Sequence, residues 1–187
     1  AAADHLAARA GDQIFARGGN AVDAAIATNA AIAVTGPHLC GMGGDLFALI
    51  STPDGVVALN SSGRAGSGAD PSVLRSAGHT VMPLRHDINT VTVPGFVDGW
   101  VALHDRFGSM PLADLLAPAI DLAEQGFPTS PLLIGALTPT DRAGLSNLAE
   151  LASQATHVGA RVRRPGVARA MRSIIDGGRN AFYLGEF

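Results

Sequence analysis

Apolar residues recur with helical spacing at the start of the chain. Leu6, Ala10 and Ile14 form one stripe, which predicts an α-helix over residues 5–17. Two glycines follow this segment, and glycine after a helix readily takes the left-handed conformation that ends it. The chain therefore opens on an amphipathic helix with one side turned toward a core.

The next segment has almost no polar side. Asn20 is followed by Asp23 at the third helical position, an arrangement typical of a capping box, so we expect a second helix over residues 21–34. Its sequence, AVDAAIATNAAIAV, is small or apolar nearly all round, and such a helix is normally buried. Its alanines allow another backbone to approach closely, so we expect it to lie on a sheet. Gly36 and Pro37 end it.

A glycine-rich turn then leads into strand-like patterns. Residues 46–51 and 55–62 each favour a β-strand, and the TPDG sequence between them has the residues of a tight turn. The pair predicts a β-hairpin. A further short β run is expected at 90–95, ended by a Pro-Gly pair.

The rest of the chain is mostly helical in pattern. The expected helices span residues 70–78 (capped by Asp70), 96–107, 110–126, 141–155 and 164–178. Pro118 falls inside the third of these, and because proline removes a backbone hydrogen bond we expect a kink or a break there. Strands and helices do not alternate, which argues against a doubly wound parallel sheet and for a mixed helix-and-strand domain.

Composition excludes several classes of function. The 187 residues are 47% hydrophobic, enough for the core of one domain, here taken as residues 1–187, or for part of a larger one. A net charge of -3 provides no basic field for nucleic acid. No apolar run reaches the roughly 18 residues that would span a membrane. The N-terminus lacks a signal-peptide pattern, which slightly favours the cytoplasm but leaves the location open.

The glycine-rich sequence CGMGGDLF invites a phosphate-loop interpretation, which its details do not support. A dinucleotide fingerprint needs a third glycine where Leu46 stands, and it needs a strand before the loop and a helix after it, the reverse of the order expected here. A Walker loop needs a lysine, and the chain has none. We therefore expect a tight connection between helix and strand, whose glycines permit unusual dihedral angles or close backbone approach.

Cysteine and histidine offer little chemistry. The single cysteine, Cys40, excludes an internal disulfide, and a lone cysteine among apolar residues is more often buried and inert than nucleophilic. His38 is near it in sequence, but that does not make a catalytic pair. The six histidines show no metal-ligand spacing, so no metal and no cofactor are expected.

The sequence LNSSGRAGSG at 59–68 is a better candidate. A strand ends there in small and polar residues, and loops at strand ends often carry function. The guanidinium of Arg64, among glycines, can present its two-pronged donor to a carboxylate of a substrate. The alternatives are an ordinary exposed arginine or one side of an internal ion pair.

Three sequence phrases together resemble the γ-glutamyltranspeptidase family. They are GGNAVDAAIATNAAIAVTGPH followed by GMGGDLFALI, VTVPGFVDGWVALHDRFGSMPLADLLAPAIDLAEQGFPTS, and FYLGE near the end. They follow the family order over nearly the whole chain. The resemblance implies an α+β fold, the αββα sandwich of N-terminal-nucleophile hydrolases, of which this chain would be a partial large-subunit segment.

The family resemblance also implies an activity and a partner. Family members cleave themselves into a large and a small subunit, and the new N-terminal threonine of the small subunit attacks γ-glutamyl amides of the glutathione type. We therefore expect no catalytic residue in this chain, a missing C-terminal segment or small subunit as its partner, and inactivity when the chain is alone. The sequence Thr156-His157 is similar to the family's nucleophile phrase, but it follows a predicted helix and is interpreted as a decoy.

The resemblance weakens at the substrate-binding arginine. Alignment on Asn60 and Ala65 puts Ser62 where transpeptidases carry the arginine that holds the α-carboxylate, and Arg64 lies two residues further on. Along a strand, positions two apart face the same way, so Arg64 can take over that role. The expected substrate-binding residues are thus Arg64, Ser62 and Ser61. The departure leaves open a cephalosporin-acylase-like amidohydrolase of the same fold, or a non-catalytic interaction module.

Overall fold

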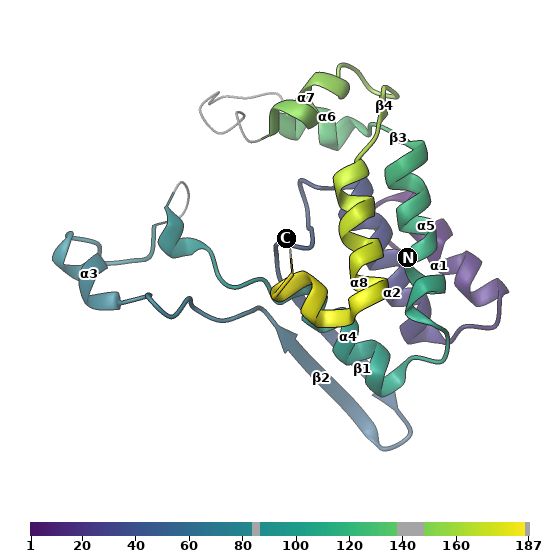
Figure 1. Cartoon of the computed structure of the whole chain (residues 1–187), viewed down its shortest axis with the longest axis horizontal. Coiled ribbons are helices and arrows are strands. Elements are labelled where there is room, and N and C mark those ends of the chain that lie inside the picture. Colours follow the sequence, from purple (N-terminus) through teal and green to yellow (C-terminus); the bar gives the residue numbers. More distant parts are fainter. Residues whose placement is uncertain (84–86, 138–147, 186–187) are drawn as a thin grey trace. The chain divides into compact units, whose positions relative to one another are not determined.

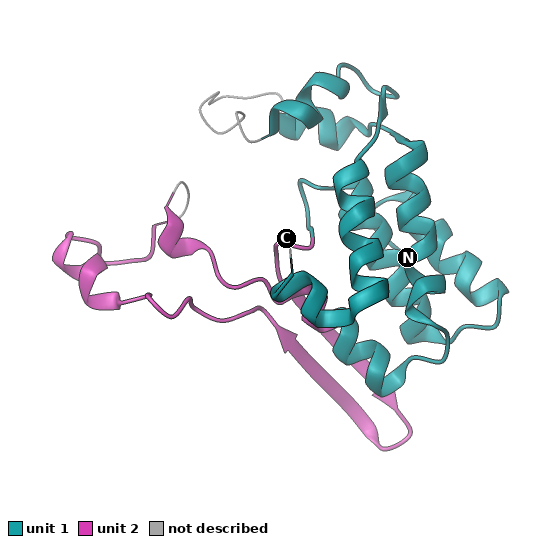
Figure 2. Cartoon of the chain, in the orientation of Figure 1, with its two compact units in different colours: residues 1–41, 100–187 teal, residues 42–99 magenta. Residues whose placement is uncertain are grey.

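The computed structural model describes residues 1–83, 87–137 and 148–185, and the chain divides into two compact units. Unit 1 comprises residues 1–41 and 100–187, and unit 2 comprises residues 42–99 (Figure 2). Helix α4 (Phe96–Phe107) begins in unit 2 and ends in unit 1. Most helices lie in unit 1, and the two longer strands lie in unit 2. This mixture of helices and strands is in keeping with an α+β class.

Unit 1 is built mainly from helices packed side by side. Its other elements are α1 (His5–Ala16), α2 (Ala21–Thr35), α5 (Leu112–Gln125), β3 (Phe127–Pro128), α6 (Pro131–Leu137), α7 (Ala149–Gln154), β4 (Arg161–Val162) and α8 (Pro165–Tyr183). Helix α2 packs against α1 and α5, and α5 packs against α8 (Figure 1). The short strands β3 and β4 pair antiparallel.

Helix α2 is buried, as its composition predicts, but its partners in unit 1 are helices and not the expected sheet. The reason is visible at Gly11 of α1. A Cβ atom there would collide with the Thr28 side chain and lie 3.2 Å from the Ala24 carbonyl oxygen. The missing side chain of Gly11 thus lets α1 and α2 approach each other closely.

The predicted capping box of α2 is confirmed and extends into a larger network. The Asn20 side chain accepts hydrogen bonds from the Val22 and Asp23 amides, and the fully buried Asp23 carboxylate accepts one from the Asn20 amide at 2.9 Å. The same carboxylate accepts hydrogen bonds from the Ser109 amide at 3.0 Å and from the Ser109 hydroxyl. One aspartate therefore fixes the start of α2 to the connection between α4 and α5.

Those hydrogen bonds also determine the charge of Asp23. Burial raises the pKa of a carboxyl group, but donors from Ser109, Asn20 and Met110 together outweigh it and leave the pKa of Asp23 below its ordinary value. The group is therefore held as a carboxylate.

Unit 2 contains the predicted hairpin. Strands β1 (Leu46–Thr52) and β2 (Gly55–Ser61) pair antiparallel, from Leu46 opposite Ser61 to Thr52 opposite Gly55. Exposed and partly covered residues alternate along β1 after the buried Leu46, and along β2 from Val56 onward. The long loop that follows contains α3 (Pro71–Ser76), capped by Asp70 as expected, and the 3-10 turn η1 (Ile88–Thr90).

Several sequence predictions need correction. The expected β run at 90–95 is an isolated bridge between Arg64 and Val93, because η1 occupies its first residue. Of the kink or break expected at Pro118, the break does not occur, since buried side chains on either side, among them Leu115 and Ile120, hold both halves of α5 in the core. Much of the expected helix over 141–155 lies outside the described residues, and α7 forms its last part.

The C-terminal helix ends at the Gly-Gly pair as predicted, and a second helical segment that the sequence did not predict follows it within α8. The dihedral angles of Gly178 (φ 61°, ψ -153°) interrupt α8 where the Gly-Gly pair predicts an end, but helical structure resumes and reaches Tyr183. The pattern also missed α6 and the pair β3–β4. These strands are two residues long, too short to show any alternation.

Candidate functional site

The residues predicted to bind substrate lie where the end of β2 meets a second segment of unit 2. The Ser61 hydroxyl donates a hydrogen bond to the Gly95 carbonyl oxygen at 2.7 Å, and the Thr92 hydroxyl donates one to the Ser62 carbonyl oxygen at 3.2 Å. The Val93 amide donates to the Arg64 carbonyl oxygen at 2.9 Å. These three bonds join residues 61–64 to residues 92–95.

The two segments are so close that each needs a glycine. Gly63 has φ +80°, and a Cβ atom at this position would overlap the Val93 carbonyl oxygen. A Cβ atom at Gly95 would overlap the Ser61 carbonyl oxygen. No side chain other than hydrogen fits either position with the surrounding backbone unchanged.

The glycine-rich turn before β1 is hydrogen-bonded to the segment that contains Gly95. The amides of Gly95 and Phe96 both donate to the Gly44 carbonyl oxygen, at 3.1 and 3.0 Å. The expectation that the glycines of this turn permit unusual dihedral angles or close backbone approach is wrong for Gly41 and Gly43. Neither has a positive φ, and a Cβ atom on either would meet nothing within 4 Å.

Arg64 projects from this junction. Its backbone is held by Val93, and the residue is exposed to solvent. No ion pair is found for its guanidinium within the described part of the chain, which disfavours the internal ion-pair interpretation. Ser62 is half-buried, and its amide donates to the Asn60 side-chain oxygen at 3.1 Å. As far as the described residues extend, the Arg64 guanidinium is held through its backbone and is open to an anionic group.

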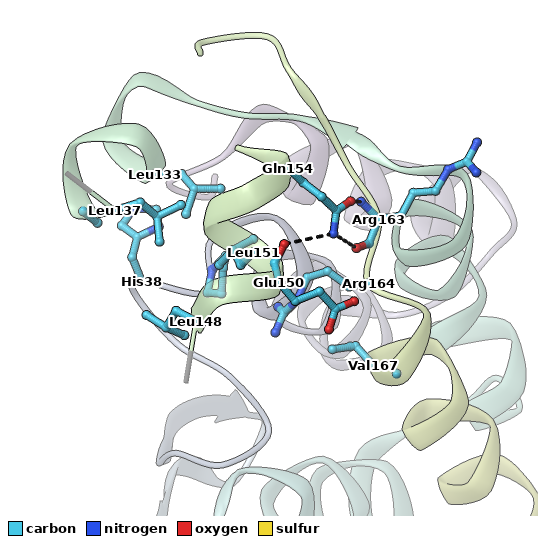
Figure 3. Close-up of a pocket in the computed structure, with 13 residues that line it drawn as sticks. His38, Leu133, Leu137, Leu148, Glu150, Leu151, Gln154, Arg163, Arg164 and Val167 are labelled. Atoms are coloured by element: carbon cyan, nitrogen blue, oxygen red, sulfur yellow. Dashed lines mark hydrogen bonds between the residues drawn. The ribbon is translucent and has the colours of Figure 1, made fainter. Parts of the chain in front are cut away.

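A separate pocket of about 290 Å³ lies in unit 1 and contains His38 (Figure 3). Leucines from α6 and α7 line one side, while the Arg164 guanidinium donates to the Ala33 and Val34 carbonyl oxygens at 2.9 and 3.3 Å, at the C-terminal end of α2. Burial lowers the pKa of Arg164, and the nearby Glu150 carboxylate opposes that shift. None of the residues expected to bind substrate lines this pocket.

Cys40 and His38 do not form a catalytic pair. Burial raises the pKa of the Cys40 thiol and lowers the pKa of the His38 imidazole, so both are driven toward their neutral forms. The buried ring nitrogens of His38 have no hydrogen-bond partner among the residues that the structure describes. The interpretation of Cys40 as an unreactive residue agrees with these environments.

Thr156-His157 lies in the loop after α7, at the end of a helix as the sequence pattern predicts. The Thr156 hydroxyl is 3.0 Å from His157 Nδ1, and both residues are exposed. Across residues 1–83, 87–137 and 148–185 no group of three histidine, cysteine or acidic side chains is placed to hold a metal ion. None of the helices described is both long and apolar enough to cross a membrane.

Sequence reasoning singled out Arg64 and its neighbouring serines as candidates but missed the residues that contact this segment. Gly44, Thr92 and Gly95 are distant in sequence from Arg64, and neither hydrophobic period nor charge pattern marks them. Their signal was present in the phrases GMGGD and TVPG, which served only to indicate the family.

Known proteins match nearly the whole length of this chain. A crystal structure of cephalosporin acylase from Bacillus halodurans superimposes with a TM-score of 0.86 and 36% identity, and the match covers 96% of this chain and 36% of that one. The solved relatives have the fold of N-terminal-nucleophile hydrolases, and this chain shares that fold. The family model for gamma-glutamyltranspeptidase matches residues 7–187, so the chain belongs to that family.

Two curated relatives show similar identity. The glutathione hydrolase-like YwrD proenzyme of Bacillus subtilis is 36% identical over 193 residues, which covers 97% of this chain and 36% of the relative. The oxamate amidohydrolase proenzyme of Klebsiella pneumoniae is 37% identical over 192 residues, with the same two coverages. The chain thus spans about a third of the length of the curated relatives it matches.

Proposed function

We propose that this chain is the N-terminal part of the large subunit of an autoprocessing amidohydrolase that hydrolyses or transfers γ-glutamyl amides of the glutathione type. The nucleophile would be the N-terminal threonine of a second segment, produced by self-cleavage, with the threonine's own amino group as base. This chain would supply scaffold helices and one wall of the substrate site. The match to proenzymes along nearly its entire length supports this assignment.

Within this proposal, Arg64 binds the carboxylate at the end of the substrate remote from the scissile amide, with Ser61 and Ser62 beside it. The observation that carries this role is the exposed guanidinium on a backbone fixed by residues 92–95. An arginine and a carboxylate can form two parallel charge-assisted hydrogen bonds, which give orientation as well as affinity. The scissile carbonyl is thereby placed at a set distance from the anchored end of the substrate.

The test uses the full-length enzyme and three anilides that release the same chromophore. The γ-glutamyl anilide has both an α-amino group and an α-carboxylate, the glutaryl anilide keeps only the carboxylate, and the 4-aminobutyryl anilide keeps only the amino group. We expect self-cleavage into two subunits by intact mass, and hydrolysis of the γ-glutamyl anilide in preference to the 4-aminobutyryl anilide. A protein that never cleaves itself and turns over none of the three would support a non-catalytic module.

A second candidate function is that of an acylase acting on a carboxylated acyl amide without an amino group. The acylase superposition favours it, as does Ser62 at the position where transpeptidases have their arginine. The glutaryl anilide distinguishes the two candidates. A higher kcat/KM for this substrate than for the γ-glutamyl anilide indicates an acylase, and the reverse order indicates a γ-glutamyl enzyme.

A further inference from the structure

We propose that Ser61, Gly63 and Gly95 are positioning residues that determine where the Arg64 guanidinium lies, and hence how well the enzyme distinguishes carboxylated substrates. The inference rests on the proposed function, because it concerns the carboxylate-binding role of Arg64. We call these three residues the arginine clamp. Gly63 directly precedes Arg64, and the Ser61 hydroxyl is hydrogen-bonded across the junction to Gly95. In this inference Ser61 acts on Arg64 through that bond, and this role replaces the direct substrate contact expected from the sequence.

The clamp acts from both sides of the junction. On one side, the positive φ of Gly63 turns the chain directly before Arg64. On the other side, Gly95 leaves room for the Ser61 carbonyl, and its own carbonyl oxygen accepts the Ser61 hydroxyl at 2.7 Å. A change at either glycine must move the backbone, because both would-be collisions are with main-chain oxygen atoms and not with flexible side chains.

The clamp matters because little else holds this segment. Ser61 is half-buried, while Gly63, Arg64 and the residues that follow them up to Ser72 are exposed. Within the described residues, the Arg64 carbonyl oxygen accepts one main-chain hydrogen bond, from the Val93 amide, and the Arg64 side chain has no ion pair. An arginine has a long and flexible side chain, so the location of its Cα sets the region that the guanidinium can reach. A displacement of about 1 Å in that region is enough to weaken a productive geometry.

The experiment measures the ratio of kcat/KM for the glutaryl anilide to kcat/KM for the butyryl anilide in the full-length mature enzyme. These substrates differ only in the carboxylate, so the ratio reports carboxylate recognition. We expect Arg64→Ala to lower the ratio by about 10- to 100-fold, the loss of a charge-assisted hydrogen-bonded pair. We expect Ser61→Ala to lower it by about 3- to 10-fold and Gly95→Ala by more, with little change for the butyryl anilide alone.

Matched controls separate the clamp from general damage. Gly66→Ala changes a glycine of the same loop that has open space around it and no positive φ. Ser51→Ala removes an exposed hydroxyl from the partner strand β1. Neither control should alter the ratio. Ser61→Ala keeps the proposal testable if Gly95→Ala fails to fold, because it removes only one hydroxyl.

The double variants decide whether the clamp acts through Arg64. In an Arg64→Ala background, Ser61→Ala and Gly95→Ala should lower the ratio no further. If the clamp variants reduce both substrates equally, or leave the ratio unchanged while Arg64→Ala lowers it, the clamp inference is overturned and the role of Arg64 survives. If Arg64→Ala itself leaves the ratio unchanged, the proposed role of Arg64 and the clamp inference both fail.

Discussion

The backbone of the two units is held in place by different interactions. Unit 1 buries apolar side chains from several helices, including Ile14, Leu116 and Ile174, each without measurable exposure. In unit 2 the described buried apolar residues are Leu46, Phe96 and Val97, and Phe47, Leu49 and Val56 on its hairpin are 64%, 79% and 70% exposed. Side-chain packing fixes the first unit, whereas close main-chain approaches at glycines and two hydroxyl hydrogen bonds fix the candidate site in the second.

The difference explains why the two units tolerate different substitutions. A packed core responds to lost volume, since the cavity left behind is only partly closed by relaxation. A junction of main-chain atoms responds to added volume, because a new Cβ has nowhere to go. Substitutions of each kind, placed in each unit, therefore test the comparison directly.

The largest effect should come from removing a core leucine. We expect Leu116→Ala in α5 to lower the free energy of unfolding by about 4 kcal/mol, the cost of lost burial together with a cavity. The same change at Leu49, on the exposed face of the hairpin, should cost less than about 0.5 kcal/mol. Urea unfolding of the 187-residue chain measures both. Equal losses at the two positions would show that the hairpin face is packed as tightly as the helical core.

Repeating the Leu49 measurement in the full-length enzyme sharpens this comparison. If another part of the enzyme covers the hairpin there, Leu49→Ala becomes as costly as a core substitution, while the effect of Leu116→Ala stays the same.

The next effect concerns the Asp23 carboxylate, which joins α2 to the connection before α5. We expect Asp23→Asn to lower the free energy of unfolding by about 3 kcal/mol, because an amide NH₂ group then faces backbone donors that remain buried. Asp12→Asn is a matched control on the exposed side of α1. The measurement is again urea unfolding. If the free energy of unfolding falls no more for Asp23→Asn than for Asp12→Asn, the hydrogen bonds of Asp23 do not contribute to the stability of unit 1.

In unit 2 the informative comparison is between glycines. Gly63 and Gly78 both have positive φ, +80° and +87°, but only Gly63 faces the backbone of another segment, whereas a Cβ at Gly78 meets nothing within 4 Å. Gly78→Ala should therefore cost about 1 kcal/mol, from the dihedral angle alone, and Gly63→Ala about 2 kcal/mol or more. Amide hydrogen exchange of Val93 reports the junction locally. Unchanged protection of that amide in Gly63→Ala would show that the close approach is not needed.

The sequence was informative where one local rule decides the structure. The capping box at Asn20, the hairpin turn and the Asp70 cap were all predictable, because each depends on residues within a few positions of one another. Arg64 was predictable as a candidate from its loop. The arginine clamp was not predictable, because Ser61 and Gly95 are 34 residues apart in the sequence and no hydrophobic periodicity indicates their contact. The partner of α2 was also not predictable, since alanine-rich faces suit sheets and helices equally.

The smallest effect is a dependence of stability on pH, and it differs between the units in kind. The pKa of Asp23 is lowered in the folded state, so its contribution to stability is fully present above its ordinary pKa of 3.8 and is lost as the pH falls through the lower folded value. Asp70 in unit 2 also has a lowered pKa, through hydrogen bonds from the Ser72 side chain and amide, but it caps an exposed helix with no buried residue.

Protonation of Asp70 should therefore loosen α3 locally without affecting the core, whereas protonation of Asp23 weakens unit 1 as a whole. Asp23→Asn should flatten the fall in unfolding free energy below about pH 4, while Asp70→Asn should leave that slope nearly unchanged. Urea midpoints measured between pH 3 and pH 6 compare the two variants with the parent chain. A slope that survives Asp23→Asn intact would assign the acid sensitivity to other carboxylates and would remove the pH distinction between the two units.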